Sequence, residues 1–142
     1  MPTTILTIDD DPEITELLSI MLKSHHFDVL SANRSEDGIQ LIKDKSPDLV
    51  MVDLMMPNID GWQVCKAVRA FSSVPILILS ALDDPGVIAS VLDAGADDYL
   101  VKPVSSAVLI AHLNKLARRT GALRLKAHDE SVRRPSTSPL IP

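Results

Sequence analysis

Aromatic residues are scarce in this chain of 142 residues, at 3% of the sequence, and cysteine occurs once, at Cys65. A single cysteine can form neither an internal disulfide nor a cysteine-rich zinc site. The four histidines lack the spacing of a zinc-binding pair, which argues against a histidine-based metal site. No apolar run approaches the roughly 20 residues of a membrane-spanning helix, and the N-terminus lacks the basic start of a signal peptide. We therefore expect a cytoplasmic protein that makes no membrane contact.

Basic residues are in the minority over most of the chain. Residues 1–120 hold 10 Lys and Arg against 17 Asp and Glu, a net charge of -7, whereas residues 121–142 hold 4 against 2. We therefore expect no direct nucleic acid binding by residues 1–120. Hydrophobic residues make up 46% of the sequence, which is enough for a core, and the length suits one domain with a tail.

Short apolar segments alternate with segments of helical periodicity. We predict strands at 5–8, 27–31, 49–52, 75–79 and 99–101, and helices after each of them. Asp11–Pro12 and Asp84–Pro85 are typical of helix starts, and Gly95 is typical of a helix end. The apolar faces of the first, third and fourth helices include Leu17, Leu22, Val64, Ala67, Val68, Phe71, Val91 and Leu92.

The predicted strands are continuously apolar, which indicates a parallel sheet covered on both faces. Right-handed crossovers then give an α/β fold, a doubly wound five-stranded sheet with helices on both faces. We assign this domain to residues 1–120. The composition changes after Thr120, and residues 121–142 are predicted to extend the last helix and then form a Pro/Ser-rich linker or disordered tail.

Reactive side chains follow four of the strands. Asp9 and Asp10 follow the first, Asp53 the third, Ser80 the fourth and Lys102 the fifth. The carboxyl ends of parallel strands share one edge, so these residues should converge there. Three carboxylates repel each other unless a cation intervenes, and an all-oxygen site suits Mg²⁺, with Mn²⁺ as a substitute. Asp53 is then the best candidate for a carboxylate that accepts a phosphoryl group.

With these residues in place, the sequence resembles a receiver (CheY-like) domain of a two-component response regulator. The resemblance rests on IDDD at 8–11, VDLMMPNIDG at 52–61, LSA at 79–81 and GADDYLVKP at 95–103, in the correct order and spacing. It covers residues 3 to about 120. It implies a flavodoxin-like sheet with strand order 2-1-3-4-5, and phosphorelay signalling in which a sensor histidine kinase or phosphotransfer protein is the donor.

The resemblance also implies a role for each site residue. Asp53 would be the phosphoacceptor, Asp10 would bind Mg²⁺ directly and Asp9 through water, and the backbone carbonyl of Met55 would complete the metal ligands. Ser80 and Lys102 would contact the phosphoryl group, and Ser80 and Tyr99 would form the switch. The Lys102–Pro103 peptide bond would be cis. The result is a phosphorylated switch rather than a turnover enzyme.

The nearest subfamily is the OmpR-like one, whose activated receivers form homodimers through the fourth helix, fifth strand and fifth helix. Val108 and His112 replace an acidic residue and an arginine of that pattern, so the polar dimer contacts are partly missing. The subfamily resemblance points to transcription control as the output. Met55 and Leu82 are apolar where side chains flank the path of attacking water, which favours slow autodephosphorylation.

Three other functions compete with the receiver hypothesis. The first is a small phosphohydrolase of the haloacid dehalogenase (HAD) type with Asp9 as nucleophile, although no cap region is visible. The second is a flavodoxin-like cofactor binder, which the three aspartates of the first loop disfavour. The third is a receiver that no longer takes phosphate and acts as a scaffold. In the simplest interpretation of the residues, Asp9 and Asp10 only cap a helix and Tyr99 only packs at an edge.

Overall fold

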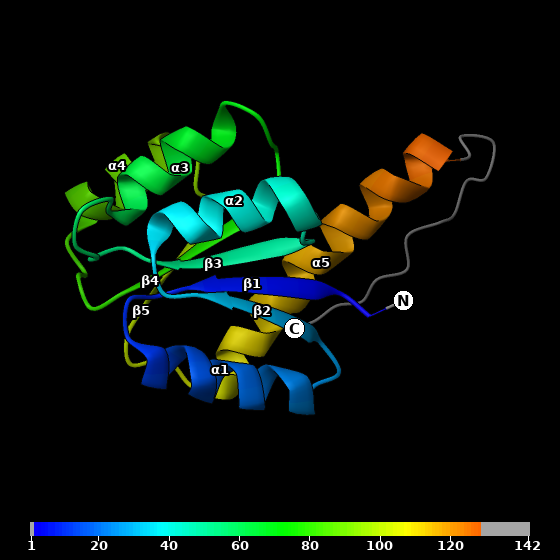
Figure 1. The fold of residues 1–142 in the computed structure, drawn as a ribbon, viewed down its shortest axis with the longest axis horizontal. Helices are drawn as coiled ribbons and strands as arrows, with labels where there is room; N and C mark the ends of the chain where they lie inside the picture. Colours follow the sequence, from blue (N-terminus) through cyan, green and yellow to red (C-terminus); the bar gives the residue numbers. More distant parts are fainter. Residues whose placement is uncertain (1, 129–142) are drawn as a thin grey trace.

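The protein is described here by a computed structural model, which covers residues 2–128, with side chains described to residue 120. Five strands alternate with five helices along the chain (Figure 1). They are β1 (Thr4–Ile8), α1 (Pro12–Ser24), β2 (Asp28–Ala32), α2 (Ser35–Lys45), β3 (Leu49–Asp53), α3 (Gly61–Arg69), β4 (Ile76–Ser80), α4 (Pro85–Asp93), β5 (Asp98–Val101) and α5 (Ser106–His128).

The strands form one parallel sheet in the order β2-β1-β3-β4-β5. Helices α1 and α5 cover one face, and α2, α3 and α4 cover the other (Figure 1). The predicted fold class and strand order are therefore confirmed. Because every strand runs in the same direction, all β–α loops gather at the carboxyl edge of the sheet.

Alternate residues of a strand lie on opposite faces of the sheet and belong to two separate hydrophobic cores. In β3, Val50 and Val52 belong to the core beneath α2, α3 and α4, whereas Leu49 and Met51 belong to the core beneath α1 and α5. All four side chains are at most 2% exposed. A central strand buried on both faces needs apolar residues at every position, which explains the continuous apolar runs in the sequence.

Acidic caps fix where three helices begin, at the carboxyl edge. The Asp11 carboxylate accepts a hydrogen bond from the N–H of Glu13, and Asp84 accepts one from Val87. Asp60 and Gln63 form a reciprocal capping box at α3. At the other edge, Gly95 has φ 123°, a left-handed conformation that favours glycine and ends the turn after α4. These caps hold the loops that carry the polar residues.

Some details of the apolar pattern were wrong. Strand β2 begins at Asp28 rather than Phe27. The side chain of Leu17 is 64% exposed, because Thr15 and Leu22 take the inward positions on α1. Helix α3 ends at Arg69, so Phe71 lies beyond it, 43% exposed and with the Lys43 ammonium 5.0 Å from its ring centroid. Two other predicted apolar positions, Ala67 and Leu92, are also exposed.

The end of the described chain is helical. Helix α5 runs to His128, beyond the predicted domain boundary at residue 120. The predicted Pro/Ser-rich linker or disordered tail falls largely in residues 129–142, which lie outside the described residues. Within residues 2–128, no helix combines the length and hydropathy that crossing a bilayer requires.

Candidate functional site

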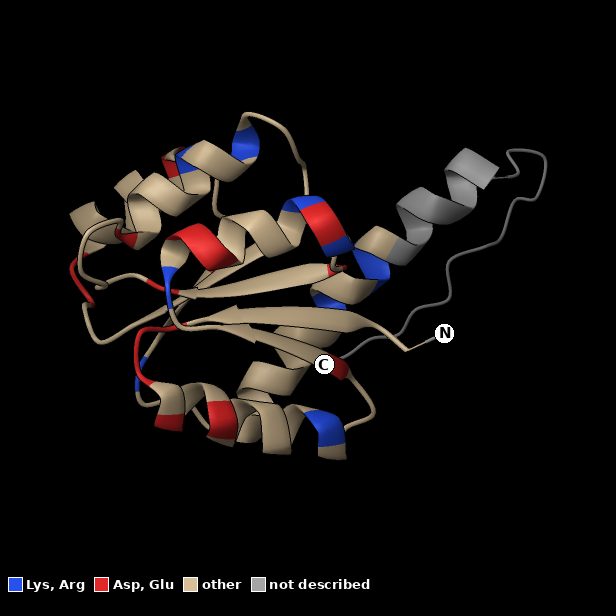
Figure 2. Cartoon of the chain, in the orientation of Figure 1, with Lys and Arg blue, Asp and Glu red and all other residues tan. Residues whose placement is uncertain are grey.

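The acidic residues singled out in the sequence meet at the carboxyl edge. Each of Asp9, Asp10 and Asp53 offers a carboxylate oxygen, and these oxygens lie within 4.8 Å of one another. Figure 2 shows acidic residues on several of the loops and helix starts at this edge, on the left of the view. Asp9 and Asp10 come from the loop after β1, and Asp53 is the last residue of β3. The neighbouring positions of β1 and β3 in the sheet bring them together.

Lys102 supplies the positive charge of the cluster. It follows β5, and its ammonium nitrogen lies 3.6 Å from Asp53 Oδ1 and 3.9 Å from Asp9 Oδ2. The side chains of Asp9 and Asp53 are only 8% and 14% exposed, whereas that of Lys102 is 34% exposed. One ammonium therefore faces three carboxylates, and the cluster keeps an excess of negative charge.

Burial raises the pKa of two of the carboxyls. It raises the pKa of Asp9, and the neighbouring Asp10 and Asp11 charges add to the effect, against a hydrogen bond from Asp11 and the attraction of Lys102. Burial likewise raises the pKa of Asp53, and Asp9 and Asp10 reinforce it, while Lys102 and the Met55 N–H act against it. Both anions are thus held in a place where their charge is unfavourable without a further cation.

Short hydrogen bonds fix the loop that carries Asp9. The Asp11 N–H donates to Asp9 Oδ1 at 2.9 Å, and the Asn33 amide donates to the Asp9 backbone carbonyl at 2.8 Å and to Thr15 Oγ1 at 3.0 Å. Asn33 and Thr15 were not singled out from the sequence. Thr15 is buried in the fold and accepts the Asn33 bond there, and the sequence alone carries no signal for this contact.

Ser80 and Tyr99 contact the same loop residue. Ser80, at the end of β4, is 1% exposed, and its hydroxyl accepts a hydrogen bond from the Leu82 N–H at 3.1 Å. The Tyr99 hydroxyl donates to the Leu82 backbone carbonyl at 2.7 Å. Both side chains that were predicted to form a switch therefore bond to one peptide segment of the β4–α4 loop.

The rim of the site contains the remaining predicted residues. Met55 follows β3 with its side chain 58% exposed, and its N–H bonds to the Asp53 carboxylate. The Lys102–Pro103 peptide bond is cis. A cavity of about 40 Å³ opens beside Asp10, lined in part by Asn33, Arg34 and Met56, and is large enough for water.

The donor set fits a hard divalent cation. All the candidate ligands are oxygens, and Asp9 is buried while Asp53 is half-buried. Asp10 is exposed and so leaves room for water in the coordination shell. Mg²⁺ and Mn²⁺ prefer this combination. A cation held there beside Lys102 would also make the edge attractive to a phosphoryl group, whose oxygens need positive neighbours.

Comparisons with known proteins agree on one family. A family model described as a response regulator receiver domain matches residues 5–114. The transcriptional regulatory protein AfsQ1 of Streptomyces coelicolor is 40% identical over 119 residues, which are 84% of this chain and 52% of that protein. The probable transcriptional regulator ycf27 of Porphyridium aerugineum is 43% identical over 115 residues, 81% of this chain and 48% of that protein. This chain spans about half the length of these curated relatives.

Solved structures support the same comparison. The BeF3-activated N-terminal receiver domain of RstA from Klebsiella pneumoniae is 34% identical, with a TM-score of 0.78 over 82% of this chain and 99% of that one. The alternative of a HAD-type phosphohydrolase using Asp9 is not supported by these similarities.

Proposed function

Because this chain belongs to the response regulator receiver domains of two-component signalling, as the sequence resemblance predicted, we propose that Asp53 is its phosphoacceptor. The observation that carries this assignment is the position of the Asp53 carboxylate. It lies within 4.8 Å of the Asp9 and Asp10 oxygens and 3.6 Å from the ammonium of Lys102. Among the residues that the structure describes, no other carboxylate is the last residue of a strand and also contacts the lysine.

The proposed reaction transfers a phosphoryl group from a phosphohistidine. A carboxylate oxygen of Asp53 forms a bond to phosphorus, the N–P bond breaks, and the imidazole leaves with the electron pair and takes up a proton. Lys102 and the Ser80 hydroxyl bind the phosphoryl oxygens, and the buried walls of the site keep Asp53 aligned. The product is an acyl phosphate that stays on the protein, so the domain acts as a switch rather than as a turnover enzyme.

We propose that Asp9, Asp10, Asp53 and the backbone carbonyl of Met55 hold Mg²⁺, or Mn²⁺ in its place. When bound, the cation would neutralise the carboxylates and the charge of the incoming phosphoryl group. The raised pKa of Asp9 and of Asp53 supports this, because buried carboxyls of that kind gain most from a neighbouring cation.

The proposed switch runs through Leu82. When the Ser80 hydroxyl turns to a phosphoryl oxygen, the Leu82 N–H loses its acceptor. The β4–α4 loop is then free to shift, and with it the carbonyl that Tyr99 holds. A few kcal/mol of differential contact are enough to change the population of two such arrangements. The α4–β5–α5 face is the surface that would change.

We propose that a sensor histidine kinase or phosphotransfer protein docks over α1. Leu17 and Ile20 are 64% and 62% exposed there, on the helix that begins directly after the acidic loop. By analogy with the regulators named above, the output is control of transcription by a separate part of a longer, cytoplasmic protein. Residues 1–120, net negative, do not bind nucleic acid directly and do not contact a membrane.

A homodimer formed on phosphorylation would use the α4–β5–α5 face. Leu92, Val101 and Val108 are exposed there, at 41%, 37% and 45%. Asp98 is engaged by His112 of the same chain. The dimer contact in this chain would therefore be more apolar than in the OmpR-like pattern. At the site itself, the apolar Met55 and Leu82 side chains favour slow autodephosphorylation.

The assignment is tested by locating the phosphoryl group. The protein is treated with acetyl phosphate and Mg²⁺, and the modified peptide is identified by mass spectrometry alongside an assay for released inorganic phosphate. We expect a stoichiometric modification at Asp53 with little phosphate release. Modification at Asp9 with continuous turnover would support a hydrolase instead, and no modification at all would support a scaffold.

A further inference from the structure

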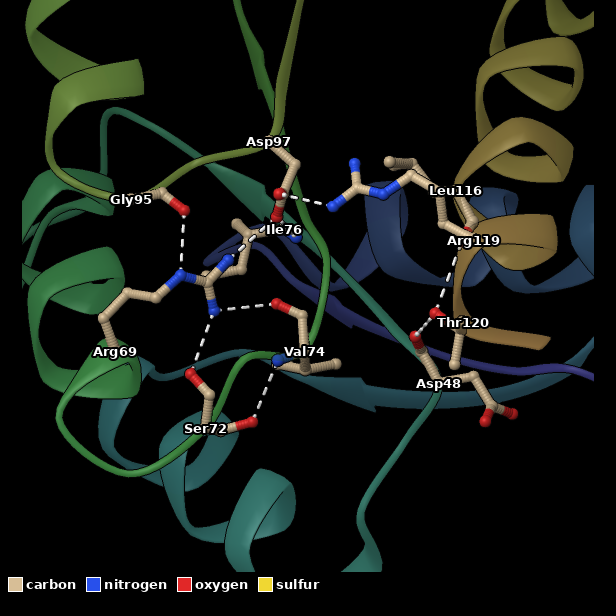
Figure 3. Close-up of polar contacts among 10 residues, drawn as sticks. All are labelled: Asp48, Arg69, Ser72, Val74, Ile76, Gly95, Asp97, Leu116, Arg119 and Thr120. Carbon is tan, nitrogen blue, oxygen red and sulfur yellow. Dashed lines mark hydrogen bonds and ion pairs between the residues drawn. The ribbon is translucent and has the colours of Figure 1, made fainter. Parts of the chain in front are cut away.

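A second polar cluster lies at the amino edge of the sheet, away from the acidic site, and centres on Asp97 (Figure 3). One carboxylate oxygen of Asp97 accepts from Arg69 Nη2 and from the Ile76 N–H, both at 2.8 Å. The other oxygen accepts from Arg119 Nη2 at 3.2 Å. We call Arg69, Ile76, Asp97 and Arg119 the Asp97 cluster. It joins the end of α3, the start of β4, the residue before β5 and the last part of α5 within the domain.

The two arginines are held very differently. Arg69 is 26% exposed and also donates to the backbone carbonyls of Gly95, Ser72 and Val74 at 3.0, 3.2 and 2.8 Å. Its side chain packs so closely on Gly95 that a Cβ there would lie 2.6 Å from Arg69 Cγ.

Arg119, by contrast, is 53% exposed and has one ion pair among the described residues. A single exposed ion pair is weak and readily broken. The Arg69 half of the cluster is therefore a fixed part of the fold, and the Arg119 half is releasable.

Asp97 is also close in sequence to the residues of the proposed switch. It immediately precedes β5, which leads within five residues to Lys102. Strand β5 has four residues and lies at the edge of the sheet, where it pairs with β4 alone. A short edge strand shifts more readily than a central one. Phosphorylation of Asp53 would add negative charge opposite Lys102, which follows the end of this strand.

Arg119 holds the helix by which the chain leaves the domain. Helix α5 continues past Thr120 to His128 and stands away from the sheet in Figure 1. Besides the Arg119 pair, Thr120 has a long hydrogen bond of 3.5 Å from its hydroxyl to the Asp48 carbonyl. Of these two contacts to the rest of the domain, the ion pair with Asp97 is the shorter.

We propose that the Asp97–Arg119 ion pair is a releasable contact through which the state of the Asp53 site controls the end of α5 and the chain that follows it. This rests on the proposed function. In the unphosphorylated protein Arg119 holds the end of α5 on the amino edge. When β5 shifts, Asp97 keeps its bonds to Arg69 and Ile76 and releases Arg119.

The test compares Arg119→Ala with Arg118→Ala in the full chain. Arg118 is the neighbouring exposed arginine, makes no polar contact within the described part of the chain, and gives the same change of charge. Amide hydrogen exchange is followed by mass spectrometry in peptides covering residues 114–128, before and after treatment with acetyl phosphate and Mg²⁺. The intact mass reports the phosphoryl group in parallel.

Before phosphorylation, we expect exchange at the end of α5 to be about threefold faster in R119A than in the parent, and unchanged in R118A. Phosphorylation should speed this exchange in the parent and in R118A but add nothing in R119A. Equal exchange in R119A and R118A would overturn the proposal. So would a parent that gains the phosphoryl group by mass without any change in α5, or an R119A protein that still responds. If the parent gains no phosphoryl group, the proposed function itself is wrong, and the proposed link between Asp53 and the Asp97–Arg119 ion pair is wrong with it.

Discussion

Charged side chains are paired in opposite ways at the two edges of the sheet: acidic groups are in excess at the carboxyl edge, and basic groups at the amino edge. At the carboxyl edge, three carboxylates gather around one ammonium, which lies 3.6 Å from Asp53 and 3.9 Å from Asp9. Burial raises the pKa of Asp9 and of Asp53. At the amino edge, one carboxylate lies between two arginines and accepts bonds of 2.8 to 3.2 Å. The first arrangement is electrostatically incomplete and the second is satisfied. In the proposed function, the first edge would bind a cation and a phosphoryl group, whereas the Arg69–Asp97 contacts at the second edge hold the fold together.

The largest effect on stability should come from the satisfied edge. Arg69→Ala removes four hydrogen bonds and leaves the largely buried Asp97 carboxylate with the exposed Arg119 as its remaining cation. We expect the free energy of unfolding to fall by about 3 kcal/mol, measured by urea denaturation. Lys66→Ala, an exposed basic position on the same helix, should change it by less than about 0.5 kcal/mol. If both variants have the same free energy of unfolding, the Arg69 contacts add no more to stability than an ordinary exposed lysine does.

The largest effect on chemistry should come from the incomplete edge. Lys102→Ala removes the ammonium that contacts Asp53. We expect phosphoryl incorporation from acetyl phosphate to slow by about 100-fold, since the developing charge loses its main protein partner. Lys115→Ala, on the exposed side of α5, is the control and should match the parent. If the two variants incorporate the group at the same rate, Lys102 takes no part in the transfer.

A cation should stabilise the carboxyl edge. At a Mg²⁺ concentration ten times the dissociation constant, binding to the folded state alone adds about 1.4 kcal/mol to the free energy of unfolding. Asp10→Asn should abolish this gain, whereas Glu13→Gln, an exposed acid in the first turn of α1, should retain it. Thermal denaturation with and without MgCl₂ measures both. A gain that survives in D10N would place the cation elsewhere.

The smallest predicted effect is a stabilisation. Asp53→Asn removes a charge that burial disfavours, and we expect it to raise the free energy of unfolding without Mg²⁺ by about 1 kcal/mol at neutral pH. Asp83→Asn, in the exposed β4–α4 loop, is the matched control. A destabilised D53N would show that Lys102 already compensates the charge.

The raised pKa values of Asp9 and Asp53 also predict how the free energy of unfolding changes with pH. In the folded protein the pKa of Asp9 and that of Asp53 are raised above the ordinary value of 3.8, so the folded state binds more protons than the unfolded state just above that value. Stability without Mg²⁺ should therefore fall as the pH rises from about 3.8 through the raised pKa values. The D53N variant should flatten this fall, and urea midpoints at several pH values measure it.

Most of the fold and the members of the acidic cluster were predictable from the sequence. Continuous apolar strands, aspartate caps followed by proline, and polar residues at strand ends all depend on local pattern. The sheet order then brings Asp9, Asp10 and Asp53 together. The exposure of Leu17 was not predictable, because periodicity marks a helical face but not how much of it the sheet covers. Nor was the role of Asp97, because its two arginines lie 28 and 22 residues away and only the folded chain joins them.

The central claim is that Asp53 at the incomplete edge takes the phosphoryl group with the help of a divalent cation. The most direct test is the intact mass of the parent and of D53N over time in acetyl phosphate, with Mg²⁺ and with a chelator. We predict that the parent gains one phosphoryl group only when Mg²⁺ is present and that D53N gains none under either condition. A D53N protein that gains the group as readily as the parent would contradict this account.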